Sequence, residues 1–225
     1  MQNKSWNSGW NKVFKKYEWG KYPAEPLIRF IGKNYKININ NKKLKVLEIG
    51  CGTGANLWYL SKQRFQTYGV DGSSVALAKA KLLLQEHNAN SKLIKTDIIK
   101  LPFPNEYFDL IIDIECLYSN SFAKSKIILK EINRVLKKNG NFFSLSFSTK
   151  TTGYNTGKRY KGEKNTFTNL KKGPLKNDYG LIRFMNKSDI KKLYNIFSIV
   201  NIEKVSRTYD NLSCLIEEWI IISKK

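Results

Sequence analysis

Short apolar runs alternate with amphipathic segments along most of the chain. Five runs have the length of buried strands, and helical patterns lie between and after them. The expected strands are 45–49, 66–70, 92–95, 108–114 and 141–147, and the expected helices are 55–62, 73–86, 125–136 and 188–197, the last capped by Ser188. Two further strands, 200–207 and 214–222, are suited to a hairpin. This alternation predicts an α/β fold, with a mostly parallel sheet and helices on both faces.

Two regions do not follow the alternation. Residues 1–34 read as an N-terminal arm and helix, because a polar and aromatic stretch is followed by an amphipathic helix that prolines introduce. Residues 149–180 are rich in Gly, Lys and Thr with weak periodicity, and we interpret them as a basic insertion. The sequence therefore predicts an arm at 1–34 and one domain at 35–225 that carries the insertion.

The strongest chemical signal is the segment from Val46 to Gly54, with the sequence VLEIGCGTG. A buried strand runs into Gly50, Gly52 and Gly54, and a helix follows. Glycines allow a tight turn and a close approach of the backbone to a ligand. The helix N-terminus offers free N–H groups to a negative or polar group. Ligands on such sheets bind at the carboxyl ends of the strands, so the residues there are the candidates.

Acidic residues mark the ends of the first three strands. Glu48 precedes the glycines, Asp71 ends the second strand and Asp97 follows the third. A carboxylate at position 71 is placed to accept hydrogen bonds from two ribose hydroxyls. Glu48 would repel a pyrophosphate but not an ammonium or a sulfonium. Asp97 is suited to an adenine amino group, with Ile98 packing on the ring; a simple turn cap is its alternative.

These motifs together resemble those of class I S-adenosylmethionine-dependent methyltransferases. The resemblance covers residues 44–148 and rests on VLEIGCGTG, VDGS at 70–73, TDI at 96–98, FDLIIDIECLY at 108–118 and EINRVLKKNGNFFSLSFS at 131–148. It implies a doubly wound, seven-stranded, mostly parallel sheet with an antiparallel C-terminal strand, and S-adenosylmethionine as cofactor. One departure is Gly72, where the family often has a bulkier residue that packs on adenine.

The resemblance also implies the cofactor site. Glu48 and the glycines would hold the methionine end, Asp71 the ribose, and Asp97 with Ile98 the adenine. N-terminal segments often cover the cofactor in this fold class, so Trp19 and Tyr22 are candidates for a lid; packing against the sheet is the alternative. The cofactor-binding residues implied are Trp19, Tyr22, Glu48, Gly50, Cys51, Gly52, Gly54, Asp71, Gly72, Ser73, Asp97, Ile98 and Asp113.

Candidates for the acceptor side follow the fourth strand. Glu115 comes after an apolar run, and we expect it at the edge of the cleft as a base; a solvated carboxylate is its alternative. Tyr118 is a candidate wall of the acceptor site, or a core residue. Arg183 has apolar neighbours and would anchor a phosphate or carboxylate of the acceptor, or form a structural ion pair. Cys116 is expected to pack near the cofactor rather than to act as a nucleophile.

The composition adds a strong positive charge. The chain has 225 residues, 41% of them hydrophobic, and 40 Lys and Arg against 18 Asp and Glu give a net charge of +22. Such a field attracts polyanions, but only six of the cations are Arg, and a Lys excess is also what an AT-rich genome supplies. Residues 150–176 carry eight cations against Glu163 alone. A solvated loop, a phosphorylated or nucleotide-linked acceptor and an RNA backbone all remain open as their explanation.

Several site classes are disfavoured. Three scattered cysteines and a single histidine, His87, do not form a disulfide framework or a metal site, and His87 is expected to be solvated. No apolar run approaches the ~20 residues of a membrane helix, and residues 1–10 lack the apolar core of a signal peptide. The sequence predicts a cytoplasmic protein without a membrane partner.

The function predicted is methyl transfer from S-adenosylmethionine to an O or N of a small, phosphorylated or sugar-type acceptor. The segments WGKYPAEPLIRFI and ECLYSNS also resemble methyltransferases of surface-polysaccharide building blocks. An RNA methyltransferase is one alternative, favoured by charge alone, since an Asn/Asp-Pro-Pro-aromatic signature and a separate RNA-binding module are absent from the sequence. A non-catalytic cofactor-binding subunit is another, and an NAD enzyme is more distant.

Overall fold

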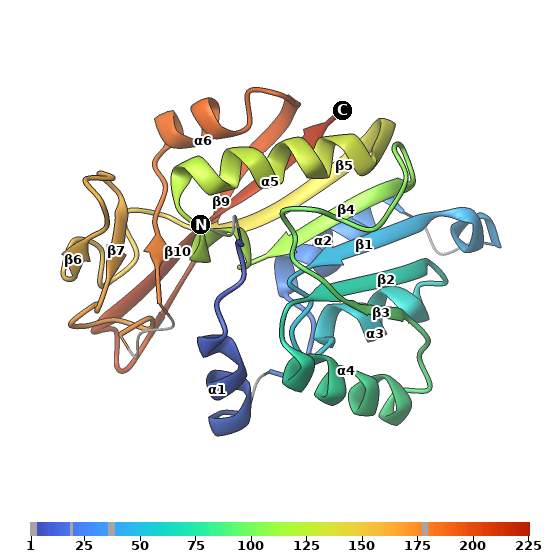
Figure 1. Ribbon diagram of the computed structural model, residues 1–225, viewed down its shortest axis with the longest axis horizontal. Coiled ribbons are helices and arrows are strands. Elements are labelled where there is room, and N and C mark those ends of the chain that lie inside the picture. The colour runs from blue at the N-terminus through green and yellow to red at the C-terminus, as the bar shows by residue number, and fades with distance from the viewer. Residues whose placement is uncertain (1–3, 19, 36–38, 177–179) are drawn as a thin grey trace.

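A seven-stranded sheet organises the protein. The computed structural model describes residues 4–18, 20–35, 39–176 and 180–225. The order of the strands is β3-β2-β1-β4-β5-β10-β9, and only β10 runs against its neighbours (Figure 1). This confirms the predicted fold class. The strands are β1 (Lys45–Ile49), β2 (Gln66–Asp71), β3 (Lys92–Lys95), β4 (Phe108–Ile114), β5 (Leu136–Phe147), β9 (Ser198–Tyr209) and β10 (Cys214–Lys224).

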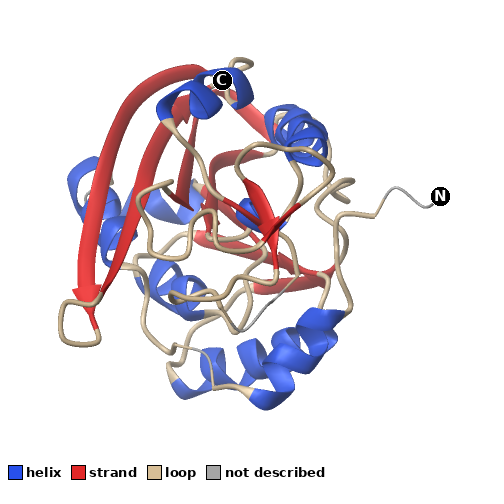
Figure 2. Cartoon of the chain, turned by 90° about the vertical axis from the view of Figure 1, so that its left-hand side faces the viewer, coloured by secondary structure: helices blue, strands red, loops and turns tan. Residues whose placement is uncertain are grey.

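The central strands are apolar on both faces because helices cover both. Side chains alternate along a strand, so Leu47 and Ile111 face one core while Val46 and Leu110 face the other. The first core includes α5 (Phe122–Val135) and α6 (Lys187–Leu193), and the second includes α2 (Glu25–Asn34) and α3 (Ala55–Lys62). Figure 2 shows helices on both sides of the sheet. The candidate residues follow the carboxyl ends of the parallel strands, and these ends lie together at one side of the sheet.

The helices begin where side chains cap them. The Ser73 hydroxyl accepts from the Ala76 N–H at the start of α4 (Ser74–Glu86), and Ser121 caps α5 in the same way. The prediction that Ser188 caps the last helix is wrong. Asn186 caps α6, because its side chain accepts from the Asp189 N–H while the Asp189 carboxylate accepts from the Asn186 N–H. The helix also ends at Leu193, and Ser198 already begins β9.

The region predicted as a basic insertion is folded. It contributes β6 (Lys158–Arg159) and β7 (Thr166–Thr168) to a second small sheet, which β8 (Ile182–Arg183) completes. Phe167, 1% exposed, packs with Phe184 and with Phe147 of the main sheet. The apolar residues of this region are few and irregularly spaced, so the hydropathy pattern alone predicted no helix or strand in it. The described part of the region is anchored to the main sheet through its apolar residues, while its cations are exposed.

The N-terminal region divides into two parts. Helix α2 is part of the core, since Leu27, Phe30 and Ile31 are buried against the sheet. Helix α1 (Gly9–Lys16), which the sequence did not predict, lies beside α4 in Figure 1. The 3₁₀ helices η1 (Ile39–Lys43) and η2 (Leu117–Ser119) complete the described elements. None of the described helices has the length and apolar character needed to cross a membrane.

Candidate functional site

A cavity of about 1230 Å³ lies at the carboxyl ends of β1, β2 and β4. Its walls come from the glycine-rich loop, the turn after β4, the β9–β10 hairpin and the N-terminal arm. Eleven of the residues singled out in the sequence line it together: Tyr22, Glu48, Gly50, Cys51, Gly52, Asp71, Gly72, Ile98, Glu115, Cys116 and Tyr118. Chain segments far apart in the sequence thus converge on one site.

The glycine-rich loop needs its glycines for space and for backbone conformation. Gly50, Gly52 and Gly54 have φ of +61°, +50° and +85°, in the left-handed region that side chains disfavour. A Cβ on Gly50 would lie 2.2 Å from the Cys116 sulfur, and one on Gly54 would lie 3.1 Å from the Ala80 Cβ. Gly54 therefore acts from behind the cavity, by letting the loop pack on α4. Cys116 packs on the loop, and burial raises the pKa of its thiol well above the ordinary value.

Glu48 presents a buried carboxyl group to the cavity. It is 2% exposed, and Asn56 donates to its Oε1 at 2.6 Å. No described residue gives Oε2 a partner, although that atom is buried. Burial raises the pKa of Glu48 to about 8, opposed by the Asn56 hydrogen bond and assisted by the charges of Asp71 and Asp113. A cationic group in the cavity would satisfy this oxygen.

Asp71 holds two loops together. Its carboxylate accepts from the Gly52 N–H at 3.0 Å and from the Ser73 N–H at 2.7 Å. Burial raises the pKa of Asp71, and these backbone hydrogen bonds oppose the rise. A carboxylate has about four acceptor positions, so Asp71 keeps capacity for a ligand hydroxyl. Ser73 is turned away from the cavity, where it caps α4 and donates to Asn11 Oδ1 at 2.6 Å.

The side chain of Asp113 points into the protein rather than into the cavity. It accepts from the N–H groups of Cys116 and Leu117, both at 3.0 Å, and from the Ser144 hydroxyl at 2.6 Å. It is fully buried, and desolvation raises its pKa. Asp113 thereby shapes the turn on which Glu115 sits.

Glu115 is aimed into the cavity by an unusual backbone conformation. Its φ of +53° lies in the left-handed region, which costs a non-glycine residue about 1–3 kcal/mol. Its side chain lies next to that of Glu218 of β10, which is 1% exposed and accepts from Arg207 Nη1 at 3.0 Å. Burial and the Glu218 carboxyl raise the pKa of Glu115 well above its ordinary value. Two carboxyl groups and a guanidinium therefore meet on the same side of the cavity.

Glu218 and Arg207 were not predicted as site residues, although the sequence contains a signal for Glu218. Glu218 shares the period-2 face of Ile220 and Ile222, both of which pack in the core. A carboxylate on the apolar face of a strand is expensive to bury unless it is paired or functional. Arg207 comes from the neighbouring strand and pairs with it.

Tyr118 and Arg183 are both buried, but only Tyr118 borders the cavity. Tyr118 lines the cavity, is 4% exposed and packs its ring on Phe147 with centroids 5.0 Å apart. Arg183 is 2% exposed, does not line the cavity and donates from Nη2 to the Leu117 carbonyl at 3.1 Å. It lies near the charge of Asp113, but its Nε and Nη1 have no partner among the described residues, so the predicted structural ion pair is not formed there. His87 is also outside the cavity and stacks on Trp58 with centroids 4.1 Å apart.

The N-terminal arm closes the cavity with residues other than those predicted. Trp19 lies outside the described residues, and Tyr22 lies at the cavity with 81% of its surface exposed. Trp6, Trp10 and Phe14 line the cavity instead. The four-residue spacing of Trp10 and Phe14 is a signal that was available in the sequence, because it places both on one side of α1, whereas Trp6 precedes the helix.

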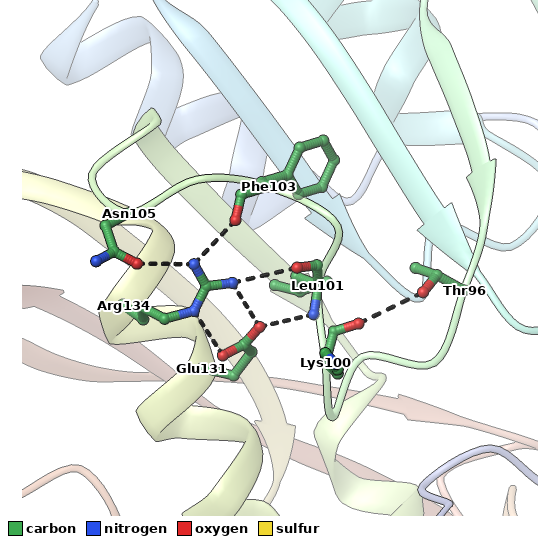
Figure 3. A network of polar contacts seen from close by, with 7 residues as sticks. All are labelled: Thr96, Lys100, Leu101, Phe103, Asn105, Glu131 and Arg134. Atoms are coloured by element: carbon green, nitrogen blue, oxygen red, sulfur yellow. Dashed lines mark hydrogen bonds and ion pairs between the residues drawn. The ribbon is translucent and has the colours of Figure 1, made fainter.

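A network around Arg134 fixes the loop that carries Asp97 and Ile98. Arg134 of α5 donates to the carbonyls of Leu101 and Phe103 at 3.1 and 2.9 Å. It also forms two hydrogen bonds with Glu131, which accepts from the Leu101 N–H at 2.7 Å (Figure 3). Because both ends of this ion pair hold backbone groups of the loop, α5 sets the position of the loop after β3.

The comparisons with known proteins agree with this geometry. A family described as "Methyltransferase domain" matches residues 40–201. The chain belongs to this methyltransferase family. The match and the fold confirm the predicted class I S-adenosylmethionine-dependent methyltransferase and its cofactor. The residues also fit that cofactor, since a buried oxygen of Glu48 lacks a partner beside the glycine loop. No cluster of metal-binding side chains occurs in the described ranges.

Individual relatives of this methyltransferase differ in what they act on. A fatty-acid O-methyltransferase of Mycolicibacterium smegmatis is 34% identical over 101 residues, 44% of this chain and 35% of that protein. A demethylmenaquinone methyltransferase of Thermotoga maritima is 29% identical over 146 residues, 64% of this chain and 61% of that protein. A SAM-dependent methyltransferase structure from Methanosarcina mazei has a TM-score of 0.73 at 17% identity, covering 87% of this chain and 96% of the other. The chain spans well under half the length of the first curated relatives it matches.

Proposed function

We propose that the protein transfers a methyl group from S-adenosylmethionine to an oxygen or nitrogen of a small acceptor. The observation that carries this proposal is the unpartnered, buried oxygen of Glu48 beside a glycine-floored cavity, since a positively charged donor satisfies it and a diphosphate does not. The family membership supports the same reaction. A cytoplasmic protein acting on a soluble small molecule is the simplest setting for it.

The donor compartment lies on the side of β1 and β2. When bound, S-adenosylmethionine supplies a methyl group activated by its sulfonium. Glu48 faces the positive charge, Asp71 accepts from the ribose hydroxyls, and Ile98 packs on the base. The residues proposed to hold or shape this compartment are Trp19, Tyr22, Glu48, Gly50, Cys51, Gly52, Gly54, Asp71, Gly72, Ser73, Asp97, Ile98 and Asp113, of which Gly54, Ser73 and Asp113 act through the loops they shape.

The acceptor compartment lies against Glu115, Glu218 and Tyr118. A hydroxyl acceptor must lose a proton as it is methylated, and a base within hydrogen-bond reach assists that loss. Burial and the Glu218 carboxyl raise the pKa of Glu115, so its carboxylate is a stronger base than an ordinary one. Glu218 lies next to Glu115, and Arg207 forms an ion pair with Glu218. Tyr118 forms the wall opposite the solvent.

The charges in the cavity favour a neutral or cationic acceptor. Five carboxyl groups line it beside three cations, and the pKa values of Glu48 and Glu115 are raised. The cavity therefore lacks the excess of positive charge, +22, that the whole chain carries. The eight cations of residues 150–176 are exposed, and none of them lines the cavity. Of the phosphorylated and sugar-type acceptors predicted from the sequence, the hydroxyl of a sugar-type molecule therefore fits better. An amine is an equal fit, and Arg183 would contribute only from behind the wall.

Calorimetry followed by a methyl-transfer assay tests the proposal. We expect the purified protein to bind S-adenosylhomocysteine, and to move radiolabelled methyl from S-adenosylmethionine onto members of a panel of sugars, nucleotide-sugars and amines. Glu115→Gln and Glu218→Gln are expected to lower kcat at least tenfold with an unchanged Kd for S-adenosylhomocysteine. Glu203→Gln, an exposed carboxylate of the same hairpin, is the matched control and is expected to behave as wild type.

Each outcome points to a different function. Absence of binding to S-adenosylhomocysteine would refute the proposal. Binding without transfer to any acceptor would favour a non-catalytic cofactor-binding subunit. Transfer to RNA but to no small molecule would favour an RNA methyltransferase, for which the exposed charge is the supporting observation. Binding of NADH in place of S-adenosylhomocysteine would point to an NAD enzyme.

A further inference from the structure

The carboxylate of Asp97 is fully occupied by the protein itself. Its Oδ2 accepts from the N–H groups of Ser5 and Trp6, at 2.8 and 3.2 Å. Its Oδ1 accepts from the Ser5 hydroxyl and from the Ile99 N–H, the latter at 3.1 Å. Four hydrogen bonds use the acceptor capacity of a carboxylate, so none remains for an amino group of a ligand. Burial would raise the pKa of Asp97, but these hydrogen bonds outweigh burial and lower it.

Gly72 makes room for a residue of the arm. A Cβ at this position would lie 2.0 Å from Cδ1 and 2.1 Å from Cγ of Trp6. The backbone of Gly72 is not in the left-handed region, so its conformation would accept any residue. The glycine is therefore required for space, because the indole ring of Trp6 occupies the volume of the missing side chain.

The indole ring of Trp6 offers a face and a donor to the cavity. Trp6 lines the cavity together with Gly72 and Ile98. Its Nε1–H is buried and has no partner among the described residues. A buried donor without an acceptor is costly, so a ligand that supplies an acceptor would bind favourably there. An aromatic face next to such a donor matches a planar heterocycle with ring nitrogens.

The arm is a fixed wall rather than a plug. Asn11 is bonded to Ser73, the Phe14 ring lies over Gly52, and the Lys124 ammonium donates to the Lys4 carbonyl. The cavity keeps its volume of about 1230 Å³ with the arm in this place. The arm therefore bounds the donor compartment without filling it.

From these contacts we infer that Trp6 recognises the base of the methyl donor, and that Asp97 is a positioning residue that anchors the arm through Ser5. The inference rests on the proposed function for the identity of the base. In this arrangement the N-terminal arm supplies a wall of the adenine compartment. Trp6 takes the place of a side chain at position 72, and Asp97 does not contact the base directly.

Calorimetry with two ligands separates the anchor from a direct contact. The ligands are S-adenosylhomocysteine and S-inosylhomocysteine, which lacks the 6-amino group. Asp97→Asn is expected to weaken both ligands by the same factor, about three- to tenfold, since it acts through the arm. A loss confined to S-adenosylhomocysteine would mean that Asp97 bonds the amino group itself, and would overturn its assignment as an anchor. Ser5→Ala is expected to weaken both ligands less than Asp97→Asn does. Ser198→Ala, exposed and outside the cavity, is its control and is expected to bind as wild type.

Variants that exchange a large and a small side chain between positions 6 and 72 test the role of Trp6 in ligand binding. Trp6→Ala is expected to weaken S-adenosylhomocysteine about tenfold, and Trp6→Phe about threefold, since the second keeps a ring but loses the N–H. Gly72→Leu alone is expected to displace the arm and to weaken binding, whereas Trp6→Ala with Gly72→Leu recovers most of the affinity. Quenching of tryptophan fluorescence by the ligand is expected to fall in Trp6→Phe.

Trypsin cleavage at Lys12, Lys15 and Lys16 reports the arm independently of ligand. Cleavage is expected to be faster in Asp97→Asn and Ser5→Ala than in wild type, but not in Ser198→Ala. If Trp6→Ala binds S-adenosylhomocysteine as well as wild type, or more tightly, the inference fails while the proposed function stands. If wild type binds neither ligand, the proposed function itself fails.

Discussion

The protonation state of Glu48 depends on whether the donor site is occupied. Burial holds its pKa at about 8, so at pH 7 the free protein keeps it mostly protonated. A cation bound beside it favours the carboxylate and lowers that pKa. Binding of S-adenosylmethionine is therefore coupled to release of a proton below about pH 8.

We predict that the affinity for S-adenosylmethionine rises from pH 6 to pH 8 and then levels. Calorimetry at pH 7 in buffers of different ionisation enthalpy is expected to detect the released proton, because the observed heat then depends on the buffer. Glu48→Gln cannot ionise and is expected to bind weakly with no buffer dependence. A buffer-independent heat for wild type would mean that Glu48 does not face the cation.

The same group makes a prediction about stability. The folded pKa of Glu48 lies above the ordinary value of 4.5, so between about pH 4.5 and pH 8 the unfolded chain has released a proton that the folded protein retains. The contribution of Glu48 to the free energy of unfolding therefore falls as the pH rises through that window. We expect thermal unfolding to show that the Tm of Glu48→Gln, measured relative to the Tm of wild type, rises from pH 5 to pH 8. Above pH 8 this difference in Tm is expected to stay constant. An equal difference at both ends would contradict the raised pKa.

At the scale of the element, the loop after β3 depends on α5. Arg134 donates to Leu101, Phe103, Asn105 and Glu131, and Glu131 holds the Leu101 N–H. Arg134→Ala is expected to cost about 2 kcal/mol of unfolding free energy, because charged hydrogen bonds to buried carbonyls are lost together. Hydrogen exchange is expected to accelerate in residues 96–105, and binding of S-adenosylhomocysteine to weaken with it.

Arg134→Lys is expected to recover little of that loss, since an ammonium cannot reproduce the planar fork that reaches several acceptors at once. Lys130→Ala, on the exposed side of the same helix, is the control and is expected to leave exchange in the loop unchanged. Faster exchange over the whole domain, rather than in this loop, would mean that Arg134 supports the core and not the site.

Elements with strong periodicity were predictable from the sequence, and those held by distant contacts were not. The bounds of β1, α3 and β4 match the predicted segments, because apolar runs between glycines and polar residues fix them locally. Helix α1 and the small sheet escaped prediction, since their burial comes from α4 and Phe147 across the fold. For the same reason the sequence indicated Asp97 as a ligand residue but not its partners Ser5 and Trp6, which lie 92 and 91 residues away.

At the scale of the whole molecule, the positive charge lies on the surface and not in the cavity. The chain has a net charge of +22, whereas five carboxyl groups line the cavity beside three cations. A basic surface around an acidic site would draw polyanions to the protein without admitting them to the methyl donor. Attraction of this kind is expected to be independent of sequence and to depend steeply on salt.

We therefore predict that RNA binds this methyltransferase without becoming methylated. Affinity for RNA is expected to fall at least a hundredfold between 50 and 200 mM salt, because many Lys–phosphate contacts release counterions. S-adenosylhomocysteine should not compete with the RNA. Exchanging Lys158, Lys161 and Lys164 together for Glu is expected to weaken RNA binding and to leave binding of S-adenosylhomocysteine intact, since these side chains are exposed and outside the cavity. Salt-resistant binding with methyl incorporation into RNA would instead make the positive surface part of the acceptor site, and the acidic cavity would then admit only an extruded base.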